Sequence, residues 1–189
     1  MKTKTLAASL IAVAIAAPAF AADSYTVDPR HTLPVFEINH LGFSTQRGRF
    51  DKTSGKITLD TAARTGSVEL TIETASIDMG ADDWNKHLKG EDFFNVEKFP
   101  TMSFKSDRLV FDGDKVVGAE GNFTLLGVTL PLKISVANFR CAPHPMNRKE
   151  TCGADVTATI IRDQFGMSKY VPAVGNTVKI MVPVEAMKD

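Results

Sequence analysis

The residues best suited to acid–base, nucleophilic or metal chemistry in this chain are its histidines and its pair of cysteines. The histidines are His31, His40, His87 and His144. No two of them have the spacing that places two metal ligands on one helix or strand, although ligands from different strands can still meet in space. The motifs of serine hydrolases, phosphate loops, dinucleotide-binding loops and zinc proteases are missing from the sequence. The sequence therefore predicts a protein that is not an enzyme and that needs no metal and no cofactor.

The N-terminal residues have the organisation of a secretory signal peptide. Two lysines precede an apolar stretch from Leu6 to Ala17, and a small-x-small site ends at Ala21. We therefore expect cleavage after Ala21, which leaves a mature domain over 22–189. Such a leader directs the chain out of the cytoplasm.

The cysteines, Cys141 and Cys152, fit an exported protein. In an oxidising compartment two such residues are expected to form a disulfide that closes the intervening loop. A nucleophilic thiol is the less favoured interpretation. A copper site of soft ligands that includes His144 and Met146 is another, but two ligands on a surface loop are weak support for it.

The charge of the chain argues against nucleic acid as a partner. The sequence has 22 Lys plus Arg and 22 Asp plus Glu, so that without the two leader lysines 20 basic residues face 22 acidic ones. A nucleic-acid binder needs a basic excess to neutralise phosphates. After the leader, no apolar stretch reaches the roughly 18 residues of a membrane-spanning helix.

Most of the mature chain alternates apolar and polar residues with a period of two, which predicts strands with one buried face. The predicted strands are 33–41, 46–50, 56–60, 68–73, 101–106, 108–111, 116–119, 122–126, 128–136, 154–160 and 177–185. The segment 81–88 differs, because it starts with acidic residues, places Trp84 and Leu88 on one side and precedes Gly90. This pattern predicts a short helix that lies against the end of a sheet.

Strands joined by short turns, with almost no helix, predict an all-β fold, either a sandwich or an antiparallel barrel. Closure is favoured because it removes exposed strand edges. An eight-stranded barrel is just wide enough to fill itself with side chains or to hold one small ligand.

Two polar residues continue apolar faces and are the informative exceptions. His40 follows Phe36 and Ile38, and Arg162 follows Ile160. An inward arginine is costly unless a carboxylate, carbonyl oxygens or an anionic ligand compensates it. Pairing with an internal acid, or a bulge that turns Arg162 outward, is the plain structural interpretation. The functional interpretation makes Arg162 an anchor for a ligand headgroup near the barrel mouth.

The chain resembles the YceI-like family along nearly its whole mature length. The matching stretches are Tyr25–Thr32, Phe36–Gly42, Gly48–Phe50, Asp92–Phe94, Phe99–Ser106, Gly121–Pro131, Ile161–Met167 and Val174–Val178. Thr32 and Leu130 depart from the family pattern, and the cysteine loop does not belong to it. The resemblance implies a lipocalin-like eight-stranded barrel in the bacterial periplasm, with an elongated pocket for a polyisoprenoid or similar long-chain amphiphile.

On this interpretation the barrel interior binds the apolar tail, and the helical segment acts as a lid or entrance rim. The predicted ligand-binding residues are Phe36, Ile38, His40, Trp84, Leu88, Phe93, Phe94, Phe104, Phe123, Leu125, Ile160 and Arg162. The favoured function is non-enzymatic transport, storage or sequestration of the amphiphile. One alternative is an interaction partner of a membrane quinone or cytochrome redox system, or a stress-response factor. The other is a hydrolase or isomerase that acts on the bound lipid with His40 as general base.

Overall fold

The computed structural model of the chain describes residues 22–189. The predicted signal peptide and its cleavage site after Ala21 lie outside the described residues. The strands are β1 (Asp23–Val27), β2 (Val35–His40), β3 (Ser44–Phe50), β4 (Thr53–Asp60), β5 (Thr65–Glu73), β6 (Ile77–Asp78), β7 (Thr101–Asp112), β8 (Lys115–Leu125), β9 (Val128–Pro143), β10 (Glu150–Ile161) and β11 (Val174–Lys188). Short 3₁₀ turns lie at η1 (Thr74–Ser76) and η2 (Arg162–Phe165), and the helix is α1 (Asp82–Lys89).

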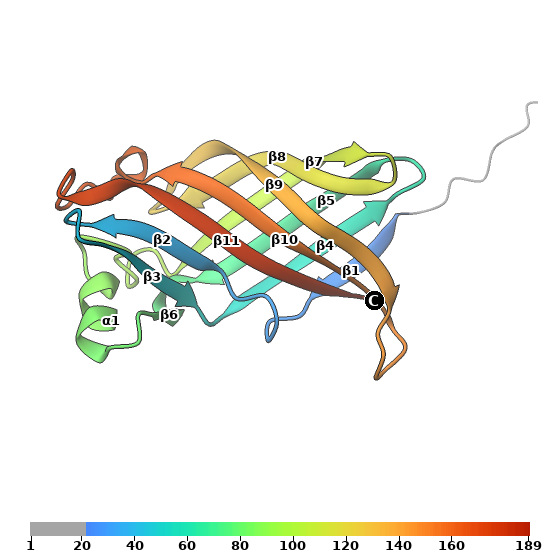
Figure 1. Cartoon of the computed structure of the whole chain (residues 1–189), viewed down its shortest axis with the longest axis horizontal. Coiled ribbons are helices and arrows are strands. Elements are labelled where there is room, and N and C mark those ends of the chain that lie inside the picture. Colours follow the sequence, from blue (N-terminus) through green and yellow to red (C-terminus); the bar gives the residue numbers. More distant parts are fainter. Residues whose placement is uncertain (1–21) are drawn as a thin grey trace, which may run out of the picture.

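Eight strands close into an antiparallel barrel in the order β1-β4-β5-β7-β8-β9-β10-β11 (Figure 1). Pairing of β1 with the C-terminal part of β11, where Tyr25 lies opposite Lys188, closes the ring. Because the ring is closed, each of these eight strands has a hydrogen-bonded neighbour on both sides, and none is an exposed edge. The predicted all-β, eight-stranded antiparallel barrel is confirmed.

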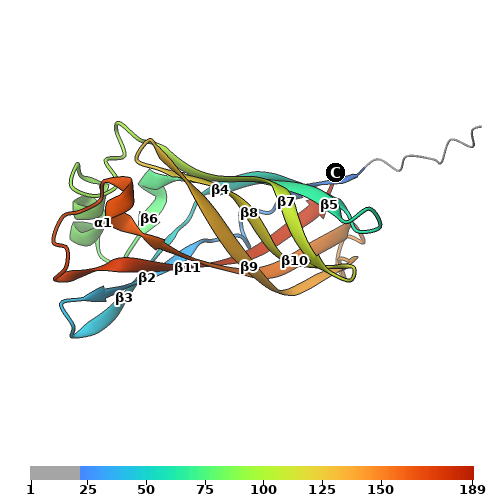
Figure 2. The ribbon, with the colours of Figure 1, turned by 90° about the horizontal axis from the view of Figure 1, so that it is seen from above.

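The remaining strands extend the barrel wall at one end. The N-terminal part of β11 pairs with β2, which pairs with β3, and β3 pairs with the short β6. The turn between β2 and β3, the segment between β10 and β11, and α1 all lie at this end (Figures 1 and 2). We call it the α1 end.

Helix α1 forms within one residue of the predicted bounds. Asp82 and Asp83 occupy its first turn and Lys86 and Lys89 its last turn, an order that complements the helix dipole. The helix is short and depends on the barrel for its apolar contacts. In residues 22–189, no helix combines the length and hydrophobicity needed to cross a bilayer.

The structure differs from the predicted strands at several points, and β9 continues to Pro143, beyond the predicted bound at 136. The predicted strands 101–106 and 108–111 form one strand, β7, because the break between them is a bulge between Lys105 and Arg108. The predicted strands 116–119 and 122–126 likewise form one strand, β8. Ser106 stabilises this bulge, since its hydroxyl donates to the Glu120 carbonyl at 2.7 Å and accepts from the Arg108 N–H at 3.0 Å. Strands β1 and β6, which have five and two residues, were not predicted.

Candidate functional site

A cavity of about 510 Å³ occupies the barrel interior at the α1 end. We call it the first cavity. Its walls come from β2, β3, β5, β7, β8, β10 and β11 and, at the mouth, from α1, from the segments that follow β6 and α1, and from the segment before β11. Volumes of about 300–1,000 Å³ are typical of small-molecule sites. The interior therefore contains vacant space of the size that a ligand needs.

A second cavity of about 140 Å³ continues along the barrel toward the opposite end. The two cavities share Ile72, Phe123 and Ile180 as lining residues. Apart from Tyr25, whose hydroxyl bonds Glu150, the second cavity is lined by apolar side chains and glycine. Together the cavities form an elongated apolar space with its polar groups gathered near one end, a shape that suits a long tail with a polar head.

The predicted ligand-binding residues line this space. The first cavity includes Phe36, Ile38, His40, Trp84, Leu88, Phe93, Phe94, Phe123, Leu125, Ile160 and Arg162. Phe104 lines the second cavity instead. Most of these side chains lie on the inward faces of their strands, as the period-two alternation predicts. Their role in holding a ligand stays a prediction.

The lining residues that were not predicted include Met79, Met102, Met167 and Tyr170. Met102 shares the inward face of β7 with Phe104 and could have been found from the same alternation. The others lie in irregular segments, where no period reports which side chains point inward. Methionine is flexible and fits apolar ligands of varied shape.

Arg162 is almost completely buried, at 1% exposure. The strand ends at Ile161, so Arg162 begins the 3₁₀ turn η2 rather than continuing β10, yet its side chain still points inward. Its guanidinium donates to four backbone carbonyls: Met167 at 2.7 Å, Lys169 at 2.8 Å, Val174 at 3.1 Å and Gly175 at 2.8 Å. Neither an internal carboxylate partner nor an outward bulge is found for Arg162 among residues 22–189, so that structural interpretation was wrong. Carbonyl oxygens compensate the charge.

These hydrogen bonds fix the segment 166–173, which we call the mouth loop. Burial lowers the pKa of Arg162, and the neighbouring Asp163 opposes that change. An arginine nevertheless stays protonated at neutral pH. Of its five N–H donors, one on Nη1 is not used by these four carbonyls. Arg162 thus organises the mouth loop and also places a positive charge beside the first cavity.

Aromatic side chains join α1 to the mouth loop. The ring of His87 lies 4.9 Å from that of Phe93 and 6.4 Å from that of Tyr170, measured between centroids. An ion pair between Lys169 Nζ and Asp92 at 3.2 Å joins the mouth loop to the segment that follows α1. The helical segment therefore forms one side of the cavity mouth, as expected for an entrance rim.

His40 has an aromatic neighbour but no hydrogen-bonding partner among the described side chains. Its ring lies 6.0 Å from the ring of Trp84, and it lines the first cavity. A general base is normally oriented by a second polar group. The surroundings of His40 are better suited to contact with a ligand.

A group of titratable residues, Asp28, His31 and Glu185, lies outside both cavities. His31 Nδ1 is 2.9 Å from Asp28 Oδ2 and 3.6 Å from Glu185 Oε2. The pKa of the buried Asp28 carboxyl is lowered, since hydrogen bonds from Arg30 and His31 outweigh its desolvation. These contacts tie the segment between β1 and β2 to β11.

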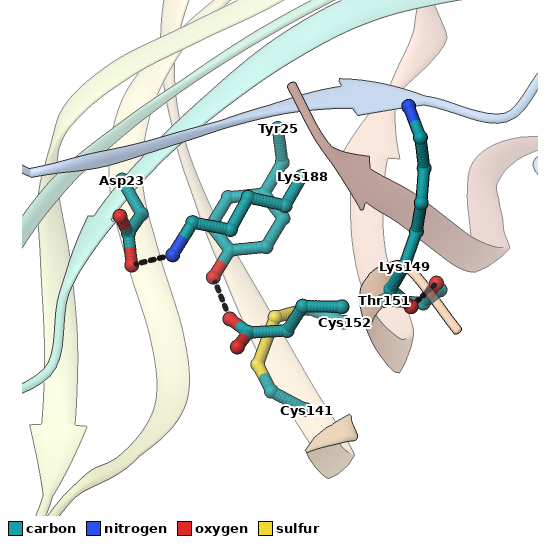
Figure 3. The surroundings of a disulfide bond; sticks show 8 residues. Asp23, Tyr25, Cys141, Lys149, Thr151, Cys152 and Lys188 are labelled. Atoms are coloured by element: carbon teal, nitrogen blue, oxygen red, sulfur yellow. Dashed lines mark hydrogen bonds and ion pairs between the residues drawn. A yellow bond between two sulfur atoms is a disulfide. The ribbon is translucent and has the colours of Figure 1, made fainter. Parts of the chain in front are cut away.

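The predicted disulfide between Cys141 and Cys152 is confirmed, and the nucleophilic-thiol interpretation is wrong. The two residues lie directly opposite each other in the β9–β10 ladder, and Cys152 lines the second cavity. Figure 3 shows the bond beside Tyr25, whose hydroxyl donates to Glu150 at 2.5 Å. Burial and this carboxylate raise the pKa of Tyr25. In the adjacent turn, His144 Nδ1 accepts from the Met146 N–H at 3.3 Å.

Removing the disulfide should lower the stability of the fold and leave ligand binding at the cavity mouth nearly unchanged. We expect the Cys141→Ser, Cys152→Ala variant to lose about 2–3 kcal/mol of unfolding free energy, because the unfolded chain regains the entropy of the closed loop. Thermal unfolding measures the loss, and wild-type protein in reductant should show the same shift. Ligand affinity should change by less than about threefold, since the bond lies at the far end from the mouth. An unchanged unfolding temperature would contradict this account.

A closed antiparallel barrel with an apolar cavity and a few polar groups near one end of it defines a small binding protein of the β-barrel class. The family comparison is more specific: the YceI-like domain model matches residues 25–186, and the chain belongs to this family. A UPF0312 protein of Shewanella putrefaciens is 33% identical over 98% of both chains. A UPF0312 protein of Pseudomonas aeruginosa is 34% identical over the full length of both.

Solved structures share the fold. The crystal structure of Burkholderia cenocepacia BcnA superposes with a TM-score of 0.71 and 23% identity, covering 84% of this chain and 98% of that one. A polyisoprenoid binding domain from Saccharophagus degradans, implicated in plant cell wall breakdown, has a TM-score of 0.63 and 14% identity, covering 90% and 100%. At these identities the likeness concerns the fold.

Proposed function

We propose that this protein binds a polyisoprenoid or similar long-chain amphiphile inside the barrel, without catalysis, for transport, storage or sequestration in the periplasm. The observation that carries the proposal is the apolar interior space, a cavity of about 510 Å³ continued by a second of about 140 Å³. Removing an apolar tail from water contributes about 0.8 kcal/mol per buried CH₂ group. The S. degradans domain that shares this fold is a polyisoprenoid binding domain, which gives further support.

Different residues would contact the apolar tail and the polar headgroup of the ligand. Phe36, Ile38 and Ile160 would contact the tail near the mouth, and Phe104, which lies opposite Phe123 where the two cavities meet, would contact it deeper in the barrel. His40 and Arg162, which line the first cavity, would meet the headgroup. The positive charge of Arg162 favours an anionic headgroup if its remaining Nη1 donor reaches the ligand.

Native mass spectrometry tests the proposal directly. Protein purified from the periplasm should carry a noncovalent hydrophobic adduct, and delipidated protein should take up added farnesol or geranylgeraniol. A uniformly apo mass together with no uptake of either alcohol would contradict it. The same purified protein should begin at residue 22, because the proposed signal peptide is removed after Ala21.

A redox or stress-response role is the second candidate, in which the partner is a membrane quinone or cytochrome system. Pull-down of a membrane cytochrome, insensitive to substitutions that fill the cavity, would favour it over the binding role. An enzymatic role predicts turnover of the bound alcohol that a His40→Gln variant abolishes. We expect the alcohol to be recovered unchanged.

A further inference from the structure

We propose that the α1 end of the barrel docks on the surface of a phospholipid bilayer through a ring of exposed apolar side chains around the cavity mouth. We call this ring the mouth rim; it consists of Leu41, Phe43, Trp84 and Tyr170. The inference rests on the proposed function and names the partner from which the cavity takes its amphiphile.

The mouth rim is assembled from three segments that meet at one end. Phe43, which is 90% exposed, is at the tip of the β2–β3 turn together with Leu41. The Leu41 N–H donates to the Ala173 carbonyl at 3.0 Å, so this turn is tied to the mouth loop. Trp84 comes from α1 and Tyr170 from the mouth loop, which Arg162 holds in place. Figures 1 and 2 both show these segments at the α1 end.

The apolar surface of the rim is continuous with the cavity. Trp84 and Tyr170 both line the first cavity while remaining 38% and 50% exposed. An amphiphile that leaves a bilayer at this rim would pass along apolar and aromatic surface into the barrel. Direct contact thus removes the step in which its tail crosses water.

The charges of the rim favour a bilayer as the occupant. Residues 41–46 have no charged side chain, and the mouth loop has only Lys169, which pairs with Asp92. Insertion of such tips into the interfacial region desolvates no unpaired charge. Aromatic side chains favour this depth of a membrane, and separate protruding turns can each enter it. Because α1 has both acidic and basic residues, attraction should not depend on anionic lipids.

Flotation with phosphatidylcholine vesicles tests the inference, using the delipidated full-length mature protein. Wild-type protein should float with the vesicles, and Phe43→Ser should lower the partition coefficient about tenfold. The matched control is Met146→Ser, since Met146 is 89% exposed on the β9–β10 turn far from the mouth. The control should float like wild type. Trp84 is the single tryptophan, and vesicles made with brominated lipid should quench its emission.

Uptake of farnesol from cyclodextrin separates docking from ligand binding. Phe43→Ser should keep its affinity for farnesol and its unfolding temperature, because its side chain lies outside the cavity. Absence of wild-type flotation, or equal flotation of wild type and Phe43→Ser, would overturn the docking inference even where farnesol binds. Failure to bind farnesol would instead overturn the proposed function. If wild-type protein associates with itself in the absence of vesicles and Phe43→Ser does not, the mouth rim binds a second copy of the chain. That result would also overturn the inference that the rim docks on a bilayer.

Discussion

Arg162→Leu is expected to lower the unfolding free energy by about 3 kcal/mol and the melting temperature by about 10 °C. The substitution keeps an apolar side chain of reasonable size but removes the donors for the carbonyls of Met167, Lys169, Val174 and Gly175. Buried acceptors left without a donor cost more than the hydrogen bonds themselves gain. Thermal and urea unfolding measure the change.

Two further variants separate the causes. Arg162→Lys keeps the charge but lacks the planar fork, so we expect it to lose most of the same stability. The control is Arg47→Leu, which removes an exposed arginine whose Nε lies 2.7 Å from Glu37 and should cost below about 1 kcal/mol. If Arg162→Leu unfolded at the wild-type temperature, the mouth loop would not depend on this side chain.

Ligand affinity then distinguishes the two roles of Arg162. Disorder of the mouth loop should weaken farnesol and farnesyl phosphate equally, because Met167 and Tyr170 line the cavity for both. An additional loss for farnesyl phosphate alone would show that the guanidinium also meets the headgroup. The comparison is made by titration at a temperature below the unfolding transition of the variant.

The barrel could be predicted because its strands repeat one simple pattern. Alternation in β9, β10 and β11 placed their apolar side chains on one face, and a curled sheet with one apolar face closes on itself. The short helix could be predicted from its acidic start and its Trp84, Leu88 pair. Local spacing was enough in both cases.

The environment of Arg162 could not be predicted, because its partners are backbone atoms. A carbonyl group carries no residue identity, and those that compensate the guanidinium belong to a loop without periodicity. Met79 and Tyr170 were not predicted as lining residues because they too lie in segments without periodicity. The vacancy of the interior also depends on how opposite walls approach each other, a long-range property that alternation within a single strand does not contain.

The continuity of the first and second cavities leads to the prediction with the largest expected effect on ligand affinity. Ala158 lines the second cavity and lies opposite Ile180, one of the side chains shared by both cavities. A larger side chain here should close the passage from the first cavity to the second. We expect Ala158→Phe to weaken geranylgeraniol about a hundredfold, since excluding about four carbon groups costs about 3 kcal/mol.

Geraniol should bind Ala158→Phe nearly as well as wild type, because a short chain fits within the first cavity of about 510 Å³. The new ring can occupy the neighbouring vacant space of about 140 Å³, so the fold should tolerate it. Thr159→Phe is the matched control, since Thr159 is exposed on the adjacent position of the same strand and points away from the interior. Titration of both alcohols against the three proteins decides the matter. Equal affinities of Ala158→Phe and wild type for geranylgeraniol would mean that the tail stops before Ile180, and that the second cavity takes no part in binding.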